Sequence, residues 1–196
     1  LTDFNDLTYA AVFSPDGSTL VTGSGDQTAI FWDVRRLAAG SQPSAFYTLS
    51  FVGKGTPGAI AFSPDGKRLA IGAGNTGYVY ALDFSQAVPA KFLYNLIGHQ
   101  GNINSIVFSP DGKRLVTAAG DNTPGNNRTK IWDAETGQEQ YTLAGDTDYA
   151  AFTPDGNRLI TSSGGVQIWD ISPSGNQELF NLSGSKQFYF SPDGKR

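Results

Sequence analysis

Residues 98–133 read GHQGNINSIVFSPDGKRLVTAAGDNTPGNNRTKIWD, and this stretch contains the repeating unit of the chain. The pentapeptide F-[ST]-P-D-G begins in it at Phe108, and the dipeptide Trp132-Asp133 closes it. The same pentapeptide begins at four further positions, which are Phe13, Phe62, Phe152 and Phe190. Successive copies lie 38–49 residues apart, a period typical of stacked structural repeats. A pentapeptide that returns five times in 196 residues predicts one kind of structural unit, used repeatedly.

The residues around each pentapeptide predict short antiparallel strands. Pro-Asp-Gly supplies a fixed φ, a side-chain acceptor and a residue that tolerates positive φ, which together favour a tight turn. Apolar and β-branched stretches flank the turn, for example at 103–108 and 115–117. A third strand is expected at 129–133 and a fourth at 139–143. Four such strands in about 40–45 residues are typical of one blade of a β-propeller.

A second marker follows the first four pentapeptides. It reads Trp-Asp at three of them, and Leu82-Asp83 stands in the corresponding place of the second; the three are Trp32-Asp33, Trp132-Asp133 and Trp169-Asp170. With Gly98-His99 ahead of the third unit, the order of motifs resembles the WD40-repeat family, and bacterial WD40 arrays in particular. The S-P-D-G-K-R turn is also similar to TolB-like propellers, and the turn at 133–137 to quinoprotein propellers. Three Trp-Asp dipeptides favour WD40 over both.

The resemblance covers essentially the whole chain and implies an all-β fold, a β-propeller of four-stranded antiparallel blades. We expect one domain over residues 1–196, with blades near 8–50, 57–98, 102–144 and 148–183 and the first strand of a fifth at 186–196. WD40 rings usually hold about seven blades, so four blades and a strand predict an incomplete ring. Roughly three missing blades, or a second copy of the chain, would then complete it.

The resemblance also implies a structural tetrad of His, Ser or Thr, Asp and Trp within a blade. The third blade offers His99, Thr117, Asp121 and Trp132, and the first offers Thr22, Asp26 and Trp32. Asn126 is an alternative to Asp121, because it lies at the same distance before Trp132 as Asp26 lies before Trp32. In such a network the indole N–H donates to the hydroxyl, and a satisfied buried network fixes one packing arrangement. As a catalytic base, His99 would instead need a nucleophile and an orienting group nearby, and the structural interpretation is favoured.

The second and fourth blades depart from the tetrad. The second has Lys54, Ile71 and Leu82 in place of His, Thr and Trp, so we expect apolar packing to hold it. Its neighbourhood is rich in aromatic residues, most of them expected in the core and one or two as exposed anchors. The fourth keeps Thr161 and Trp169 on a shorter hairpin.

Two surface features are candidates for binding. The segment between the second and third strands of the third blade is long and polar, and we expect a protein or peptide partner to contact it through Asn122, Asn126, Asn127, Arg128 and Lys130. A neutral surface insertion is the other interpretation of this segment. Basic residues also follow four of the Pro-Asp-Gly turns, and beside the turn aspartates we expect them to form a solvated rim; they are Lys67-Arg68, Lys113-Arg114, Arg158 and Lys195-Arg196.

Composition disfavours several other partners. A net charge of −4 argues against nucleic acid, and no apolar run approaches the length of a membrane span. With one histidine and no cysteine we expect no metal and no cofactor, although Asp146 and Asp148 leave a weak alternative of calcium. The chain begins at Leu1 without an initiator methionine, so the compartment is left open, with cytoplasm slightly favoured.

These observations favour a protein-interaction scaffold that is not an enzyme, and that serves as a regulatory appendage of a larger signalling protein in one version of the hypothesis. The alternative is a propeller enzyme, either a quinoprotein-like oxidoreductase or a hydrolase. That alternative requires a convergent polar cluster, which the sequence does not assemble.

Overall fold

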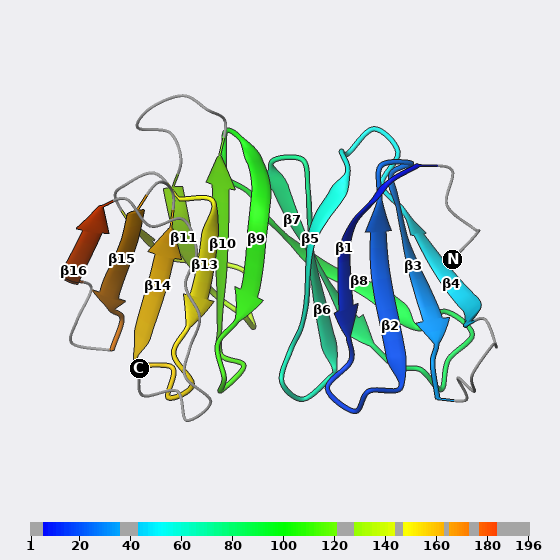
Figure 1. Cartoon of the computed structure of the whole chain (residues 1–196). Helices are drawn as coiled ribbons and strands as arrows, with labels where there is room; N and C mark the ends of the chain where they lie inside the picture. The colour runs from blue at the N-terminus through cyan, green and yellow to red at the C-terminus, as the bar shows by residue number, and fades with distance from the viewer. Residues whose placement is uncertain are drawn as a thin grey trace.

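Residues 6–35, 43–120, 128–143, 147–162, 165–172 and 177–183 are described by a computed structural model. Within these ranges the regular structure is β-strand, arranged as four separate four-stranded antiparallel sheets (Figure 1). The predicted all-β fold of four-stranded blades is confirmed. The strand predicted at 186–196 lies outside the described residues.

In each sheet the strands follow one another in chain order. The first sheet contains β1 (Thr8–Phe13), β2 (Thr19–Ser24), β3 (Thr28–Asp33) and β4 (Ser44–Ser50). The second contains β5 (Pro57–Phe62), β6 (Arg68–Ala73), β7 (Thr76–Leu82) and β8 (Ala90–Leu96). The third contains β9 (Asn102–Phe108), β10 (Arg114–Gly120), β11 (Arg128–Asp133) and β12 (Glu139–Leu143). The fourth contains β13 (Tyr149–Phe152), β14 (Arg158–Ser162), β15 (Gly165–Asp170) and β16 (Gln177–Ser183).

The Pro-Asp-Gly turns join the first two strands of every sheet. In the third sheet the Ser109 hydroxyl donates to Asp111 Oδ1 at 2.6 Å and accepts the Arg114 backbone N–H at 2.9 Å. The turn closes with the Gly112 N–H donating to the Ser109 carbonyl at 2.8 Å, and Gly112 has a φ of +70°. That backbone angle strains any residue with a Cβ, which explains the glycine at this position.

The core consists of three apolar layers, each between two successive sheets. Val21 and Phe31 of the first sheet pack with Leu69 of the second. Val79 of the second packs with Leu115 and Trp132 of the third, and the opposite face of the third packs on the fourth. Neighbouring side chains of one strand point to opposite faces, so a central sheet contributes to two layers.

The sheets are arranged as an open fan (Figure 1). The first strands of successive sheets lie side by side along its inner side, and β1 contacts β5, which contacts β9, which contacts β13. The first and fourth sheets stand at opposite ends of the fan (Figure 1). The arrangement is that of consecutive propeller blades in a ring that is not closed.

All four sheets share an irregularity between their third and fourth strands. The pairing register shifts at Phe31/Trp32, Val79/Tyr80, Ile131/Trp132 and Ile168/Trp169. The shift occurs at the same place in each sheet. Equivalent residues of the four sheets can therefore be matched by counting from it.

Candidate functional site

Three of the four predicted tetrad residues of the third sheet form one buried hydrogen-bond chain. Trp132 on β11 donates its indole N–H to the Thr117 hydroxyl on β10 at 2.8 Å. His99 Nε2 lies 2.6 Å from the same hydroxyl, and His99 comes from the connection between β8 and β9. All three side chains are buried. Asp121 and its alternative Asn126 lie outside the described residues.

The first and fourth sheets repeat the indole contact without a histidine. Trp32 donates to the Thr22 hydroxyl at 2.7 Å, and Trp169 donates to the Thr161 hydroxyl at 3.0 Å. Asp26 accepts from the backbone N–H of Thr28 at 3.0 Å and from its hydroxyl at 2.6 Å. Its carboxylate therefore holds the turn between β2 and β3.

The second sheet corrects one residue assignment. Leu69 pairs with Tyr80, as Leu20 pairs with Trp32 and Leu115 with Trp132. Tyr80, not Leu82, therefore stands at the tryptophan position. Leu82 instead matches Ala134, because each donates its backbone N–H to the lysine that follows the Pro-Asp-Gly turn. The prediction from the dipeptide Leu82-Asp83 was wrong because the hairpin of this sheet is shorter.

The predicted solvated rim is wrong for two arginines, which connect sheets instead. Arg68 of the second sheet donates to the Gly112 carbonyl of the third at 2.7 Å and also to the Ala134 carbonyl. Arg114 of the third repeats both contacts on the fourth, donating to the Gly156 carbonyl at 2.6 Å and to the Ile171 carbonyl at 2.5 Å. We call these two sets of contacts the arginine clamps.

Each arginine clamp also stacks a guanidinium on an aromatic ring. The Arg68 guanidinium carbon lies 5.4 Å from the centre of the Phe108 ring, and that of Arg114 lies 5.6 Å from the Phe152 ring. Both rings belong to the pentapeptide of the next sheet. Thr19 occupies this position in the first sheet, so the first and second sheets meet without an arginine clamp.

The aromatic residues around the second sheet divide between core and surface. Phe51 and Tyr80 are buried, and the Phe51 ring packs edge-on against Tyr78 at 5.4 Å. Phe46 and Phe84 are partly exposed and pack against each other at 6.0 Å.

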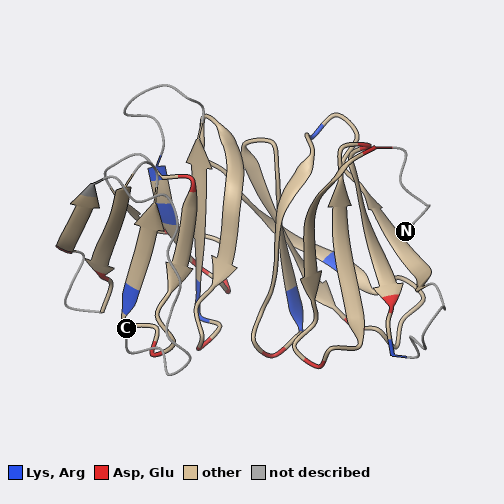
Figure 2. Cartoon of the chain, viewed as in Figure 1, with Lys and Arg blue, Asp and Glu red and all other residues tan. Residues whose placement is uncertain are grey.

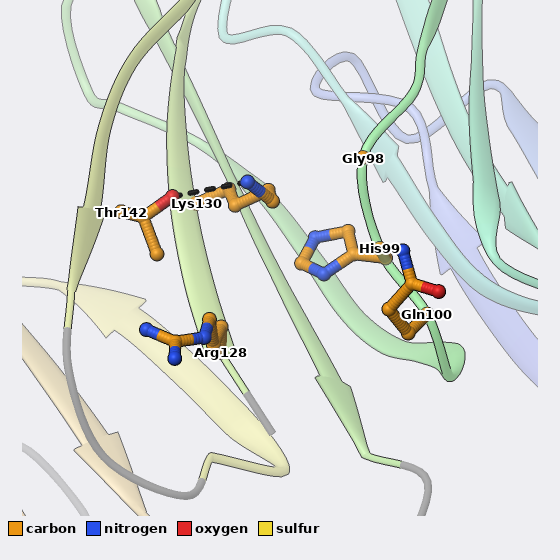
Figure 3. A pocket seen from close by; sticks show the side chains of 6 residues that line it. All are labelled: Gly98, His99, Gln100, Arg128, Lys130 and Thr142. Atoms are coloured by element: carbon orange, nitrogen blue, oxygen red, sulfur yellow. Dashed lines mark hydrogen bonds between the residues drawn. The ribbon is translucent and has the colours of Figure 1, made fainter. Parts of the chain in front are cut away.

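A pocket of about 390 Å³ lies beside the His99 network and is lined by residues of the third sheet and of the connection between β8 and β9 (Figure 3). Gly98, His99 and Gln100 form one side, and Arg128, Lys130 and Thr142 form the other. Two of the five residues predicted to bind a partner, Arg128 and Lys130, are therefore in this lining. Asn122, Asn126 and Asn127 lie outside the described residues.

Lys130 is held in place by two acceptors. Its ammonium donates to Glu139 Oε2 at 2.7 Å and to the Thr142 hydroxyl at 3.0 Å. The ammonium also lies 5.8 Å from the centre of the Trp132 ring. A Cβ at Gly98 would stand 3.3 Å from the Lys130 Cε, so the glycine leaves room for this side chain.

The electrostatics of the pocket favour a neutral histidine beside a fixed cation. Burial, assisted by the charge of Lys130, lowers the pKa of His99 to about 4. Burial opposes ionisation of Glu139, but hydrogen bonds from Lys130 and Thr142 outweigh it and lower the pKa of that carboxyl. At neutral pH the lining thus contains two cations, one of them neutralised by Glu139.

A second hollow of about 800 Å³ lies between the third and fourth sheets. Asp111, Asp133 and Asp155 line it together with Lys113 and the arginine clamp of Arg114. Each aspartate accepts hydrogen bonds from its own turn, so they hold the turns together.

Clusters of metal-ligating side chains and membrane-spanning helices are both absent from the part of the chain that the structure describes. No group of three or more His, Asp or Glu side chains there is placed to hold a metal ion; Asp146 lies outside it. None of the described residues forms a helix long and apolar enough to span a membrane.

The comparisons with known proteins agree with this geometry. The family model described as "WD domain, G-beta repeat" matches residues 4–33 and 90–133. No curated protein matches the chain significantly. The first matched segment ends with Trp32-Asp33, and the second contains the His99–Thr117–Trp132 network and ends at Asp133. Together with the four blade-like sheets, these matches support the assignment of the chain to the WD40-repeat family.

Proposed function

We propose that this chain is a protein-interaction scaffold, which presents loops on a rigid propeller frame and does not catalyse a reaction itself. WD40 repeats in general mediate contacts between proteins. One observation carries the proposal: the sheets form a tightly packed frame, and an accessible pocket lies at the ends of its strands. Loops on a rigid scaffold lose little conformational freedom when a partner binds.

The rigidity of the frame comes from contacts between sheets. Each sheet packs against the next through an apolar layer. Arginine clamps also join the second sheet to the third and the third to the fourth. Charge-assisted hydrogen bonds are roughly twice as strong as neutral ones. Relative movement of these three sheets would break several such bonds at once.

The pocket lies at the end of the sheets away from the Pro-Asp-Gly turns. β10 ends at Gly120 and β11 begins at Arg128 at this end, and the 97–101 connection joins β8 to β9 there. Figure 2 shows basic residues on β11, in a chain whose net charge is −4. We place the partner-binding surface at this end.

Further blades, or a second copy of the chain, would complete the ring in this proposal. Phe13 of β1 is 59% exposed, whereas the equivalent Phe62 is 9% exposed because the first sheet covers it. At the other end of the fan, Arg158 stands at the position of Arg68 and Arg114. The blade that meets Phe13 would bring an arginine to the carbonyls of the first sheet. In the wider proposal the completed ring is a regulatory appendage of a larger signalling protein.

Affinity capture from the native host tests the scaffold function. We expect specific protein partners to be recovered with the wild-type chain and lost with Arg128→Glu, which reverses a charge at the pocket. Lys113→Glu is the matched control, because it makes the same charge change in the same sheet beside a Pro-Asp-Gly turn. Recovery of no partner, or equal loss with both variants, would contradict the proposal, as would substrate turnover by the purified chain.

A further inference from the structure

We infer that the pocket beside His99 binds one carboxylate side chain of a protein partner, with Arg128 as the anchoring cation. The inference rests on the proposed interaction function and specifies the chemistry of one of its contacts.

The two basic residues of β11 have no counterpart in the other sheets. At the position of Arg128 the other sheets have Thr28, Thr76 and Gly165. At the position of Lys130 they have Ile30, Tyr78 and Gln167. Because three sheets form without these cations, the blade architecture does not require them. Residues that depart from a structural pattern are expected where a protein has a function to perform.

The burial of Lys130 costs free energy, because its side chain is charged. Its side chain is only 11% exposed, and a buried ammonium loses much of its hydration. Glu139 and Thr142 compensate for that loss and hold the ammonium at the pocket wall. A neutral side chain like those of the other sheets would avoid the cost. Because Lys130 is present despite this cost, its ammonium is available as a hydrogen-bond donor that is held in position at the pocket wall.

The net charge of the pocket lining indicates which kind of anion would bind there, a carboxylate or a phosphate. Glu139 neutralises Lys130, and among the described residues no acidic group forms an ion pair with Arg128. His99 is neutral at pH 7 and adds no charge. Within the described part of the chain, Arg128 is therefore the lining cation that no carboxylate pairs with, and its planar fork fits one carboxylate through two parallel hydrogen bonds. A phosphate dianion is better matched by two or more free cations.

The size of the pocket limits how much of the partner enters it. A volume of about 390 Å³ is near the small end of ligand pockets. It accepts an acidic side chain and its immediate neighbours, while the rest of the partner stays on the surface. Gln100 and Thr142 stand on opposite sides of the opening and offer further polar contacts (Figure 3).

The test is a titration of the 196-residue chain with end-blocked tripeptides, followed by ¹H–¹⁵N NMR. The probes are acetyl-Gly-Glu-Gly-amide, its glutamine analogue and its phosphoserine analogue. The chain has three tryptophans and one histidine. His99 lines the pocket and Trp132 lies behind it against Lys130 and His99, so both rings report on the pocket, while Trp32 and Trp169 serve as internal references. We expect the glutamate peptide to shift the Trp132 and His99 signals saturably, with a dissociation constant of about 1–10 mM for a single charged contact.

Three variants separate the anchoring role from general electrostatics. We expect Arg128→Ala to weaken binding of the glutamate peptide roughly fivefold or more, and Arg128→Lys to weaken it less, because a lysine keeps the charge but loses the fork. Lys91→Ala removes an exposed cation of β8 and should leave binding unchanged. Unchanged reference signals from Trp32 and Trp169 show that each variant is folded.

Several outcomes would overturn the inference. They are equal binding of the glutamine peptide, tighter binding of the phosphoserine peptide than of the glutamate peptide, an equal effect of Lys91→Ala, and no saturable shift with any probe. None of them removes the scaffold function, which depends on capture of whole partners. Conversely, loss of all partner capture with retained glutamate binding would contradict the scaffold function alone.

Discussion

The shared feature at the residue scale is an indole N–H that donates to a threonine hydroxyl between the second and third strands of a sheet. It occurs at Trp32, Trp132 and Trp169, and the third sheet adds His99 to it. A buried donor that loses its acceptor costs more than the bond contributes, because it loses its hydration as well. The Thr117 hydroxyl contacts both Trp132 and His99. Of the three threonines in these contacts, Thr117 is therefore the one whose loss we expect to cost most.

Replacement of Thr117 by valine should therefore destabilise the chain. The methyl group fills the space of the hydroxyl but leaves the Trp132 indole N–H without its acceptor, and we expect the free energy of unfolding to fall by about 1–3 kcal/mol. Thr117→Ser keeps the hydroxyl and should lose clearly less. Urea denaturation followed by circular dichroism measures both. Equal stability of the valine variant and the wild type would show that the network does not stabilise the blade.

The stability of the chain should fall as the pH is lowered from about 6.5 to about 4 because of His99. Its pKa is about 4 in the folded chain and about 6.5 when unfolded, so the unfolded state binds more protons within this interval. The loss is on the order of 2–3 kcal/mol at the acid end. Urea denaturation at several pH values measures it, and His99→Gln should flatten the slope above pH 4.5. An NMR titration that gives His99 a pKa near 6.5 would contradict this.

How well the residue-scale contacts could be predicted depends on the length of the connecting turns. The spacing of the motifs placed Thr22 beside Trp32 and Thr117 beside Trp132, because antiparallel pairing relates those positions directly. The same reasoning failed at Leu82, because a shorter hairpin shifts the register and a leucine carries no signal of its own. His99 was predictable only through its resemblance to a family motif.

At the scale of the element, the arginine clamps are the feature that links one sheet to the next. Each joins residues that lie far apart in the chain, such as Arg114 and Ile171, through carbonyls of two different turns. A single repeat contains the arginine but not its acceptors. The sequence thus indicated a charged rim, and only the packing of consecutive sheets reveals that the guanidinium groups of Arg68 and Arg114 are used between them.

Replacement of Arg114 by lysine should loosen the interface between the third and fourth sheets. Lysine cannot reach both the Gly156 and Ile171 carbonyls with a rigid fork, and hydrogen bonds that involve charged groups contribute about 1.5–3 kcal/mol. We expect a loss of that order in the free energy of unfolding. Arg35→Lys is the control, because Arg35 forms an exposed ion pair with Asp33, and it should change stability by less than about 0.5 kcal/mol. Equal effects of the two changes would argue against the arginine clamps as stabilising contacts.

At the scale of the whole molecule, the open fan leaves apolar surface on its first sheet. Leu7, just before β1, and Tyr9 and Phe13 within it are all more than half exposed. Inside the fan the equivalent surface of the second sheet is covered by the first sheet. Soluble proteins rarely expose large contiguous apolar patches that have no partner.

We therefore expect the 196-residue chain to self-associate as its concentration rises, and Phe13→Asp to weaken that association. The aspartate places a charge within the apolar face, where burial against another blade is costly. Val52→Asp is the matched control, because Val52 is also exposed but lies in the β4–β5 connection. Sedimentation velocity over a hundredfold range of concentration measures the average mass. A wild-type chain that stays monomeric throughout would contradict this expectation and the proposed completion of the ring.

The register shift shared by all four sheets has a consequence for the outer rim of the fan. β4, β8, β12 and β16 are edge strands, with one side not paired to a neighbour within their sheets. A regular exposed edge is a template on which strands of other molecules can polymerise into fibrils. The bulge between the third and fourth strands bends and twists that edge at the same place in each sheet. Each of the four sheets thus has, next to its outer edge strand, a bulge of the kind that disfavours pairing with strands of other molecules.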